Sequence, residues 1–480
     1  MRRLELVFIP TPAIGHLIPA VEFCKLLVER NDQLSITILL MKQSFDPKLT
    51  HYCNSIAASL PSAHGIKFID LPDVAAPAAN KTFFISMIES NKSHVKAAVS
   101  QLMAGAEPPR KLAGFVVDIL CTCMMEVANE FGVPSYIFST SGAAYLGLLL
   151  HVQDLHDNQG VDSVEFKDSG AELALPGLVN PLPAKVLPSP LFDKDWLPII
   201  LDMARKFRES KGLIINTFLG LESHAITTFN ENKTKMSPPV YPVGPILNLK
   251  GRSDDHIKEE EIMEWLDHQP PSSVVFLCFG CTGSFSVDQV KEIASALECC
   301  GHRFLWSLRQ SRYKAGGLPV DFSDLRDVLP DGFLDRTVGH GKVIGWAPQA
   351  RVLAHPSVGG FVSHCGWNSI LKSIWFGVPL ATWPLFAEQQ FNAFEMVVEL
   401  GLGVEIKMDY RRDRVMFGDE EDFVSAKEIE MGIRCVMDRN NERTKRLKEL
   451  REESKKTLMD GGSSYVSMCS LIQDITDNML

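Results

Sequence analysis

The feature that most constrains the fold is a repeated alternation of short apolar runs with longer segments of helical periodicity. In the first half of the chain, runs rich in Val, Ile and Leu are separated by stretches whose apolar residues recur every three to four positions. The strands that this pattern predicts are Leu6–Pro10, Ser35–Met41, Ile66–Leu71, Gly114–Asp118 and Ser135–Phe138. Such strands, joined by helices, are typical of parallel βαβ units in a doubly wound α/β sheet.

The second half repeats this rhythm. Its predicted strands are Ser273–Phe279, Phe304–Leu308, Val343–Trp346, Gly360–Ser363 and Leu380–Trp383. A Pro-rich stretch and a polar stretch lie between the halves, so we predict an N-terminal domain over 1–245, a linker over 246–258 and a second domain over 259–460. Two Rossmann-like domains of this kind bind ligands at the carboxyl ends of their strands, in the cleft between them.

Charge and composition exclude several classes of function. The chain has 480 residues and a formal net charge of −11, a poor electrostatic match to nucleic acid or to an anionic membrane. No run approaches the roughly 20 apolar residues that a membrane-spanning helix needs. The 11 cysteines are an odd number and lie mostly in apolar stretches, which favours a reducing compartment. We therefore expect a monomeric cytoplasmic protein whose partners are small molecules.

One segment of the second half carries most of the chemical information. It contains Trp346-Ala347-Pro348-Gln349, then His364-Cys-Gly-Trp-Asn-Ser369, and ends at Pro384-Leu-Phe-Ala-Glu-Gln389. Asn368 and Ser369 fall where a helix begins, and free N–H groups at a helix start bind anions such as a diphosphate. Trp346 offers a flat face to a base, and Glu388 and Gln389 offer hydrogen-bonding groups to sugar hydroxyls.

This segment resembles the nucleotide-sugar signature of plant secondary-product UDP-dependent glycosyltransferases, over its whole length from Trp346 to Gln389. The resemblance implies the GT-B fold, in which a last helix, here within 461–480, crosses back to the N-terminal domain. It also implies that a UDP-sugar is a co-substrate, with no cofactor and no metal. The positions it assigns to sugar-donor binding are Thr140, Cys281, Trp346, Ala347, Gln349, His364, Trp367, Asn368, Ser369, Lys372, Glu388 and Gln389.

The resemblance also implies which part of the UDP-sugar several of these residues bind. It implies that Trp346 stacks on uracil and that Gln349 lies on the ribose side. His364, Asn368 and Ser369 would bind the diphosphate, whereas Trp367, Glu388 and Gln389 would hold the sugar. A final Gln, here Gln389, is associated with glucose as the donor sugar.

A second candidate site lies in the N-terminal half. His16 follows Gly15 at the first strand-to-helix turn, where a lone His is more often a cap than a catalyst. Asp118 ends another predicted strand, and the carboxyl ends of parallel strands converge, so the two side chains could meet. A carboxylate on one imidazole nitrogen would leave the other as a base. The resemblance assigns His16 and Asp118 to the catalytic pair of an inverting transfer.

Two residues depart from the family pattern. Lys372 stands where the family usually has a Glu that binds the ribose hydroxyls, and an ammonium only donates hydrogen bonds. Cys281 stands where a Ser usually faces a phosphate, and a thiol is the weaker hydrogen-bond donor. Both changes fall in the nucleotide half. The hypothesis is that sugar-donor binding is weakened or altered while the acceptor chemistry is retained.

The sequence thus predicts an inverting UDP-glucose-dependent O-glycosyltransferase for a phenolic, flavonoid or terpenoid hydroxyl. The alternative that stays open is a degenerate GT-B binding protein, or a glycosyltransferase whose nucleotide-sugar binding is weakened or altered by Lys372 and Cys281. A redox role for Cys278-Phe-Gly-Cys281 is disfavoured, because Cys278 is expected to be a strand residue. A nicotinamide-dependent oxidoreductase is disfavoured, because no G-x-G-x-x-G follows the first strand. The acceptor pocket is expected to be mainly apolar and to be formed by His16, Phe83–Ile88, Asp118–Cys121, Ser139–Leu146 and Leu187–Leu201.

Overall fold

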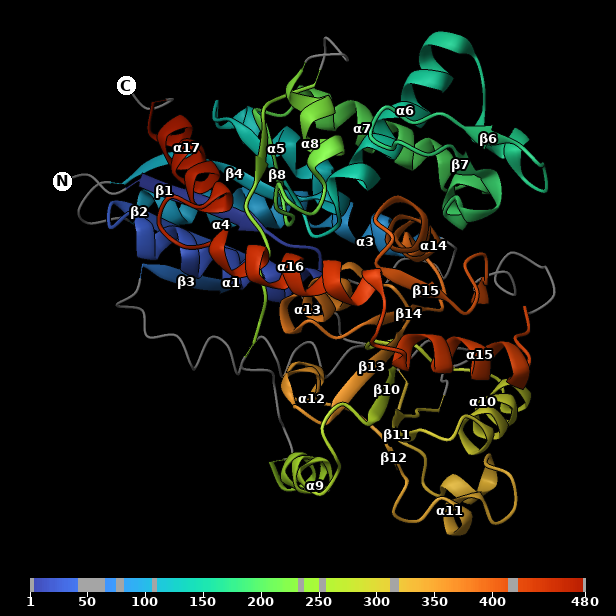
Figure 1. The fold of residues 1–480 in the computed structure, drawn as a ribbon. Helices are drawn as coiled ribbons and strands as arrows, with labels where there is room; N and C mark the ends of the chain where they lie inside the picture. Colours follow the sequence, from blue (N-terminus) through green and yellow to red (C-terminus); the bar gives the residue numbers. More distant parts are fainter. Residues whose placement is uncertain are drawn as a thin grey trace.

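Two parallel β-sheets form the framework of the protein, one in each half of the chain (Figure 1). They are seen in a computed structural model that describes residues 4–41, 65–74, 82–105, 110–231, 237–249, 256–310, 319–412 and 422–477. Each sheet is built from strands separated in sequence by helices, as the alternation of apolar runs predicts. The fold prediction of two Rossmann-like units is confirmed.

The first sheet has seven strands in the order β3-β2-β1-β4-β5-β8-β9. Every pairing in it is parallel. The strands are β1 Leu4–Ile9, β2 Leu34–Leu40, β3 Ile66–Asp70, β4 Lys111–Asp118, β5 Ser135–Ser139, β8 Gly212–Ile215 and β9 Val240–Pro242. Strand β2 is buried along its whole length, as expected for a strand covered by helices on both faces.

Helices cover this first sheet. The α-helices of this half are α1 Ile14–Arg30, α3 Phe83–Ser90, α4 Lys92–Ala104, α5 Met125–Glu130, α6 Ala143–Gln159, α7 Leu197–Glu209 and α8 Ser223–Asn230. Short 3-10 turns are η2 Ile119–Met124, η3 Ser163–Phe166, η4 Ala184–Val186 and η5 Ser189–Phe192. A small antiparallel pair, β6 Glu172–Leu173 and β7 Leu182–Pro183, lies apart from the main sheet.

The second sheet has six parallel strands in the order β12-β11-β10-β13-β14-β15. They are β10 Val274–Cys278, β11 Arg303–Ser307, β12 Gly341–Ile344, β13 Val358–Ser363, β14 Leu380–Thr382 and β15 Gly403–Glu405. The helices are α9 His256–Asp267, α10 Val287–Cys299, η7 Leu325–Asp327, α11 Phe333–Arg336, α12 Gln349–Ala354, α13 Trp367–Phe376, α14 Gln389–Phe394, the π-helix η8 Glu395–Glu399, α15 Ala426–Met437, α16 Glu442–Lys456 and α17 Ser463–Asp477.

The last helix lies against the first half of the chain, not the second. Figure 1 shows α17, in red, beside the blue strands, and it packs on α1, β4 and β9. Its Leu471 and Ile475 are buried in the same apolar cluster as Phe8 of β1. Ser464 Oγ also donates to the carbonyl oxygen of Gly244 at 2.6 Å. Residues 478–480, the end of the predicted last helix, lie outside the described residues.

The connection between the halves runs from the end of β9 at Pro242 to the start of α9 at His256. Strand β9 joins the first sheet by pairing with β8, although it lies in the Pro-rich stretch. Helix α9 already begins at His256, inside the predicted linker, and residues 250–255 of that linker lie outside the described part of the chain. Strands β8, β9 and β15 were not predicted, because runs of three or four residues are too short to show a period.

Candidate active site

His16 and Asp118 meet at the carboxyl edge of the first sheet. Asp118 is the last residue of β4, and His16 lies in the first turn of α1, which follows the neighbouring strand β1. Parallel pairing of β1 with β4 brings their carboxyl ends to the same edge. The Nδ1 atom of His16 lies 2.9 Å from Oδ2 of Asp118. The structure therefore brings together two predicted site residues from distant parts of the sequence.

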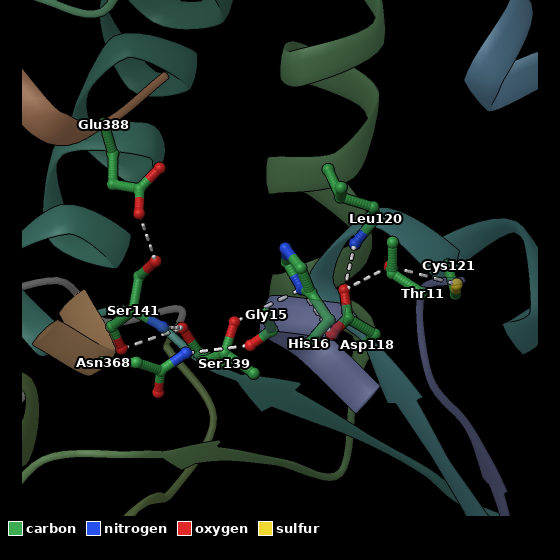
Figure 2. A network of polar contacts seen from close by, with 11 residues as sticks. Thr11, Gly15, His16, Asp118, Leu120, Cys121, Ser139, Ser141, Asn368 and Glu388 are labelled. Atoms are coloured by element: carbon green, nitrogen blue, oxygen red, sulfur yellow. Dashed lines mark hydrogen bonds and ion pairs between the residues drawn. The ribbon is translucent and has the colours of Figure 1, made fainter. Parts of the chain in front are cut away.

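The carboxylate of Asp118 is held in place by further contacts (Figure 2). Its side chain is 1% exposed. Its other oxygen, Oδ1, accepts hydrogen bonds from Thr11 Oγ1 at 2.6 Å and from the backbone N–H of Leu120 at 3.1 Å. Thr11 was not predicted as a site residue. Its position just after β1, where the carboxyl end of a strand opens into a loop, was the signal that could have found it.

These contacts determine which imidazole nitrogen can act as a base. Nδ1 of His16 faces Asp118 and also lies 3.2 Å from Thr140 Oγ1, so it is the nitrogen that carries the proton toward the carboxylate. Nε2 makes no hydrogen bond within the described part of the chain, and the side chain is 24% exposed. Burial lowers the pKa of His16, but the charge and hydrogen bond of Asp118, helped by Glu388, raise it further, so that the net shift is upward.

Residues of the second half approach His16 from the other side. Ser141 Oγ donates to Glu388 Oε1 at 3.3 Å, and Asn368 Nδ2 donates to the carbonyl oxygen of Gly15 at 2.9 Å. Figure 2 shows both bonds in the same network as His16 and Asp118. Thr140 and Ser141 follow β5, so the loop after β5 connects the imidazole to the second half. Predicted site residues from both domains thus lie around His16.

His364 lies just beyond the end of β13 and is 8% exposed. Its ring is packed between two glycines, because a Cβ added to Gly280 or to Gly366 would come within 2.5 and 2.6 Å of Nε2. Its Nδ1 has no hydrogen-bond partner in the described residues. Burial, then the charges of Lys372 and Arg309, lower the pKa of His364 to about 4. It is therefore a neutral, buried imidazole with an unused nitrogen.

Helix α13 begins at the same place. It starts at Trp367, after Gly366, with no side chain capping its first N–H groups. The first N–H groups of a helix have no partner within the helix and attract anions. Arg309 lies close to this end, is 6% exposed, and donates to the carbonyl oxygen of Gly280. Positive charge, a helix start and an unused imidazole nitrogen thus converge where a diphosphate is expected.

Lys372 makes a contact that the sequence did not predict. Its Nζ donates to Gln349 Oε1 at 3.0 Å, and Gln349 Nε2 in turn donates to Ser369 Oγ at 3.0 Å. Burial lowers the pKa of this ammonium. Lys372 has no carboxylate partner among the described residues. The bond to Gln349 occupies the amide oxygen that the resemblance places on the ribose side.

The two cysteines of the C-x-x-C segment differ in exposure. Cys278 ends β10 and is 5% exposed, whereas Cys281 is exposed, and both thiols are free. Burial raises the pKa of Cys278. A buried thiol of raised pKa is a poor nucleophile, because the thiolate is the reactive form. This property does not favour the redox alternative.

The remaining predicted residues differ in exposure and in whether their polar atoms already have partners. Trp346 is 40% exposed after β12, next to buried Ala347, so its ring is available for stacking. Trp367 is 2% exposed and its Nε1 donates to the carbonyl oxygen of Asn216 at 2.7 Å, so its indole N–H is already engaged. Gln389 is buried, and its Oε1 accepts from the backbone N–H of Leu385 at 2.9 Å. Its amide nitrogen remains for a ligand.

Comparison with known proteins identifies the family to which the chain belongs. Residues 239–411 match the family described as UDP-glucoronosyl and UDP-glucosyl transferase. The chain is 54% identical to anthocyanidin 3-O-glucosyltransferase 1 of Manihot esculenta, covering 96% of this chain and 100% of that protein. The chain belongs to the plant UDP-glycosyltransferases. It is also 52% identical to UDP-glucose flavonoid 3-O-glucosyltransferase 6 of Fragaria ananassa, with 98% of each chain covered.

Solved structures of this family share the fold of the enzyme. A UGT transferase from Siraitia grosvenorii in complex with UDP is 45% identical and superposes with a TM-score of 0.87, covering 99% of this chain and 100% of that one. UGT71G1 of Medicago truncatula, complexed with UDP-glucose, is 41% identical with a TM-score of 0.87, covering 99% and 98%. The architecture of this UDP-glycosyltransferase is therefore GT-B, as predicted. The alternative of a degenerate binding protein is not favoured.

No described helix of the glycosyltransferase is long and apolar enough to cross a membrane. Within the same ranges, no three His, Cys, Asp or Glu side chains are grouped so that they could hold a metal ion.

Proposed function

We propose that this UDP-glycosyltransferase transfers glucose from UDP-glucose to a hydroxyl group of a small lipophilic plant metabolite, with inversion at the anomeric carbon. The observation that carries the proposal is the His16–Asp118 pair, which leaves Nε2 of His16 free and lies next to bonds between the two halves, from Ser141 to Glu388 and from Asn368 to Gly15. Flavonoids and anthocyanidins are the first acceptors to consider, because the relatives from Manihot and Fragaria are named for glucosylating them. Phenolic and terpenoid hydroxyls are the wider class.

In the proposed reaction, His16 Nε2 takes the proton of the acceptor hydroxyl. The acceptor oxygen forms a bond to the anomeric carbon while the bond from that carbon to the diphosphate breaks, and UDP leaves with the electron pair. Asp118 stabilises the imidazolium that results, and its own contacts to Thr11 and Leu120 keep it oriented. A single displacement inverts the configuration.

The sugar-donor side of the proposal rests on His364, the start of α13 and Arg309. Their N–H groups and positive charge would stabilise the negative charge that develops on the leaving diphosphate. Trp346 would stack on uracil, and Ser369 and Gln349 would contact the nucleotide. Glu388 and Gln389 would bind the glucose hydroxyls. The unused Nδ1 of His364 and the unengaged amide nitrogen of Gln389 support this assignment.

The test is an assay of acceptor-dependent UDP release. The purified enzyme is incubated with UDP-glucose and a panel of flavonols, anthocyanidins, simple phenols and terpenoid alcohols, and glucosides are identified by mass spectrometry. We expect UDP release and glucoside formation with at least one acceptor, and loss of both in His16→Ala. Glucoside formation that survives unchanged in His16→Ala would contradict the proposed base, and UDP release without any acceptor product would contradict the proposed transfer.

We also propose that the enzyme works in the cytoplasm as a monomer. The ten described cysteines are all free, which is typical of a reducing compartment. Imaging of a fluorescent fusion tests the location, and size-exclusion chromatography with light scattering tests the monomer.

A further inference from the structure

One arginine of the second half is buried against a segment of the first half. Arg411 follows β15 and is 5% exposed. Its Nη1 donates to Ser189 Oγ at 2.7 Å, and its Nη2 donates to the carbonyl oxygen of Lys185 at 2.7 Å and to that of Leu187. The guanidinium carbon also lies 5.6 Å from the centre of the Phe192 ring, which is a cation–π distance. A single side chain thus joins the second half to this segment.

The contacts of Arg411 use the planar fork of its guanidinium. A guanidinium carries several N–H donors in a fixed plane, so one arginine can hold a hydroxyl and two carbonyl oxygens in defined relative positions. Burying this charge without such partners would be very costly. The two carbonyl oxygens belong to η4 and to the residue after it, so the position of the chain between η4 and η5 depends on Arg411.

The backbone around Arg411 is attached to the stretch after β14 that carries the predicted sugar-binding residues. Gln390 Nε2 donates to the carbonyl oxygen of Tyr410 at 2.8 Å. The N–H of Arg412 donates to the carbonyl oxygen of Leu385, also at 2.8 Å. The residues predicted to bind the sugar hydroxyls lie between these two attachment points in the sequence. Arg411 therefore extends toward the first half from a base that is fixed to the sugar-binding stretch.

The segment that Arg411 holds, residues 184–192, lies between the sugar-binding stretch and the catalytic carboxylate. Its η4 contacts α14, the helix that begins at Gln389, and in Figure 1 the green chain after β7 lies beside orange α14. Leu187 is fully buried in the same apolar cluster as Cys121 of η2, the turn that follows Asp118. Leu187 also begins the last of the stretches that we expect to form the acceptor pocket.

A second contact holds the chain just before this segment. Glu399, the last residue of η8, accepts hydrogen bonds from the backbone N–H groups of Val179 and Asn180. The Nδ2 atom of Asn180 also donates to Glu399, at 2.5 Å. Strand β7 lies between this contact and η4. The second half therefore holds this part of the first half on both sides of β7.

We propose that Arg411 is a positioning residue for the acceptor, because it holds 184–192 at a fixed place relative to Glu388 and Gln389. One wall of the acceptor pocket is then set by the half of the enzyme that binds the sugar donor. The inference rests on the proposed function, since it concerns how the acceptor is oriented toward the sugar. Without Arg411 the segment keeps its apolar packing but loses its attachment to the second half. The acceptor is then less well oriented, whereas the nucleotide contacts on α12 and α13 remain.

The experiment compares the full-length wild type with Arg411→Met, Ser189→Ala, the double variant and the control Arg434→Met. Met keeps a long side chain but cannot donate a hydrogen bond. Arg434 is an exposed arginine that donates to Glu430 and to the carbonyl oxygen of Cys299, both in the second half. The KM for the acceptor and the KM for UDP-glucose are measured separately, with an acceptor that the wild type glucosylates.

We expect Arg411→Met to raise the acceptor KM by about tenfold and to change the UDP-glucose KM by less than about twofold. Ser189→Ala should raise the acceptor KM by a smaller factor, and it should add nothing in the Arg411→Met background, because its partner is already gone. Arg434→Met should leave both KM values unchanged. An unchanged acceptor KM in Arg411→Met, equal rises in both KM values, or additive effects of Arg411→Met and Ser189→Ala would overturn the proposal.

Hydrogen exchange gives a readout that does not depend on activity. The N–H groups of Leu187 and Leu191 make hydrogen bonds within the segment, to Ala184 and Pro188, and they exchange when the segment opens. We expect peptides that cover 184–192 to exchange faster in Arg411→Met than in the wild type and in Arg434→Met. Unchanged exchange in a folded Arg411→Met would overturn the positioning role.

Two further comparisons keep the test decisive. If Arg411→Met does not fold, Ser189→Ala, which removes only a hydroxyl, is judged by the same two readouts, and no change in either would overturn the proposal. If the wild type glucosylates no acceptor, the proposed function fails. The exchange result still decides whether Arg411 holds the segment, so the two failures are distinguishable.

Discussion

The Nδ1 atom of His16 lies 2.9 Å from Oδ2 of Asp118, although 102 positions separate the two residues in the sequence. The parallel strands β1 and β4 are neighbours, so their carboxyl ends lie at the same edge of the sheet. The contact with Asp118 at this edge makes the imidazole of His16 a candidate base. The same edge carries Thr11, which orients the carboxylate.

Removing either member of the pair should abolish most of the activity. General base catalysis is worth about 10²–10⁴-fold in rate. We expect kcat to fall by about this factor in His16→Ala, with the KM for UDP-glucose changed little, because the imidazole acts on the acceptor. Steady-state kinetics with both substrates varied separately measure this. A large rise in the UDP-glucose KM with kcat preserved would place His16 on the sugar-donor side instead.

The pH profile should report the raised pKa of His16. A base must be neutral, so activity should fall as the pH is lowered through that pKa, which lies above the ordinary imidazole value of about 6.5. In Asp118→Asn the charge that raises the pKa is gone, while burial still lowers it. The acid limb of log kcat/KM should therefore move to lower pH, in addition to a loss of rate. An acid limb at the same pH in both proteins would contradict the assignment.

Thr11→Val should weaken the orientation of Asp118 without removing its charge. The hydrogen bond from Thr11 Oγ1 to Asp118 is 2.6 Å long, and losing a bond to a charged group costs about 1.5–3 kcal/mol. Only part of this free energy should be added to the activation free energy of the reaction, so we expect kcat to fall by roughly tenfold. Thr11→Ser is the matched control, because it keeps the hydroxyl and should retain activity. Equal loss in both variants would point to packing.

Lys372→Glu should strengthen sugar-donor binding. The ammonium of Lys372 now occupies Gln349 Oε1, and a carboxylate at this position would accept two hydrogen bonds from a ribose. We expect the KM for UDP-glucose to fall by about tenfold, equivalent to about 1.4 kcal/mol. Cys281→Ser, which restores a hydroxyl on an exposed loop, should lower it less. Identical KM values for the wild type and both variants would refute the hypothesis that these departures weaken binding.

Several site residues could be read from the chain because their signals are local. The runs that become β1, β4 and β13 are apolar and short, and the polar residue after each marks the carboxyl edge of a sheet. His16 lies in the helix turn after the first of these runs, Asp118 ends the second, and His364 follows the third. The glycine before Trp367 is likewise a local signal for the start of the helix. Local hydrophobic periodicity and turn residues therefore determine the fold class and most candidate positions.

Other contacts had no local signal. Lys372 was expected to face the nucleotide, yet its partner is Gln349, which lies on another helix. Trp367 was expected to reach the sugar, yet its indole N–H donates to the backbone of the first half at Asn216. In both cases the direction of a side chain depends on what packs against it, and the sequence spacing does not contain that information.

The sequence by itself determined two parallel α/β sheets, a nucleotide-sugar segment and a candidate acid–base pair, because each depends on the order of residues along a few elements. Only the tertiary structure decided that Lys372 donates to Gln349, and that Thr11 holds Asp118. The physical reason is that protonation and hydrogen bonding of a buried group depend on burial and on neighbours from distant segments, which exist only once the two sheets are packed together.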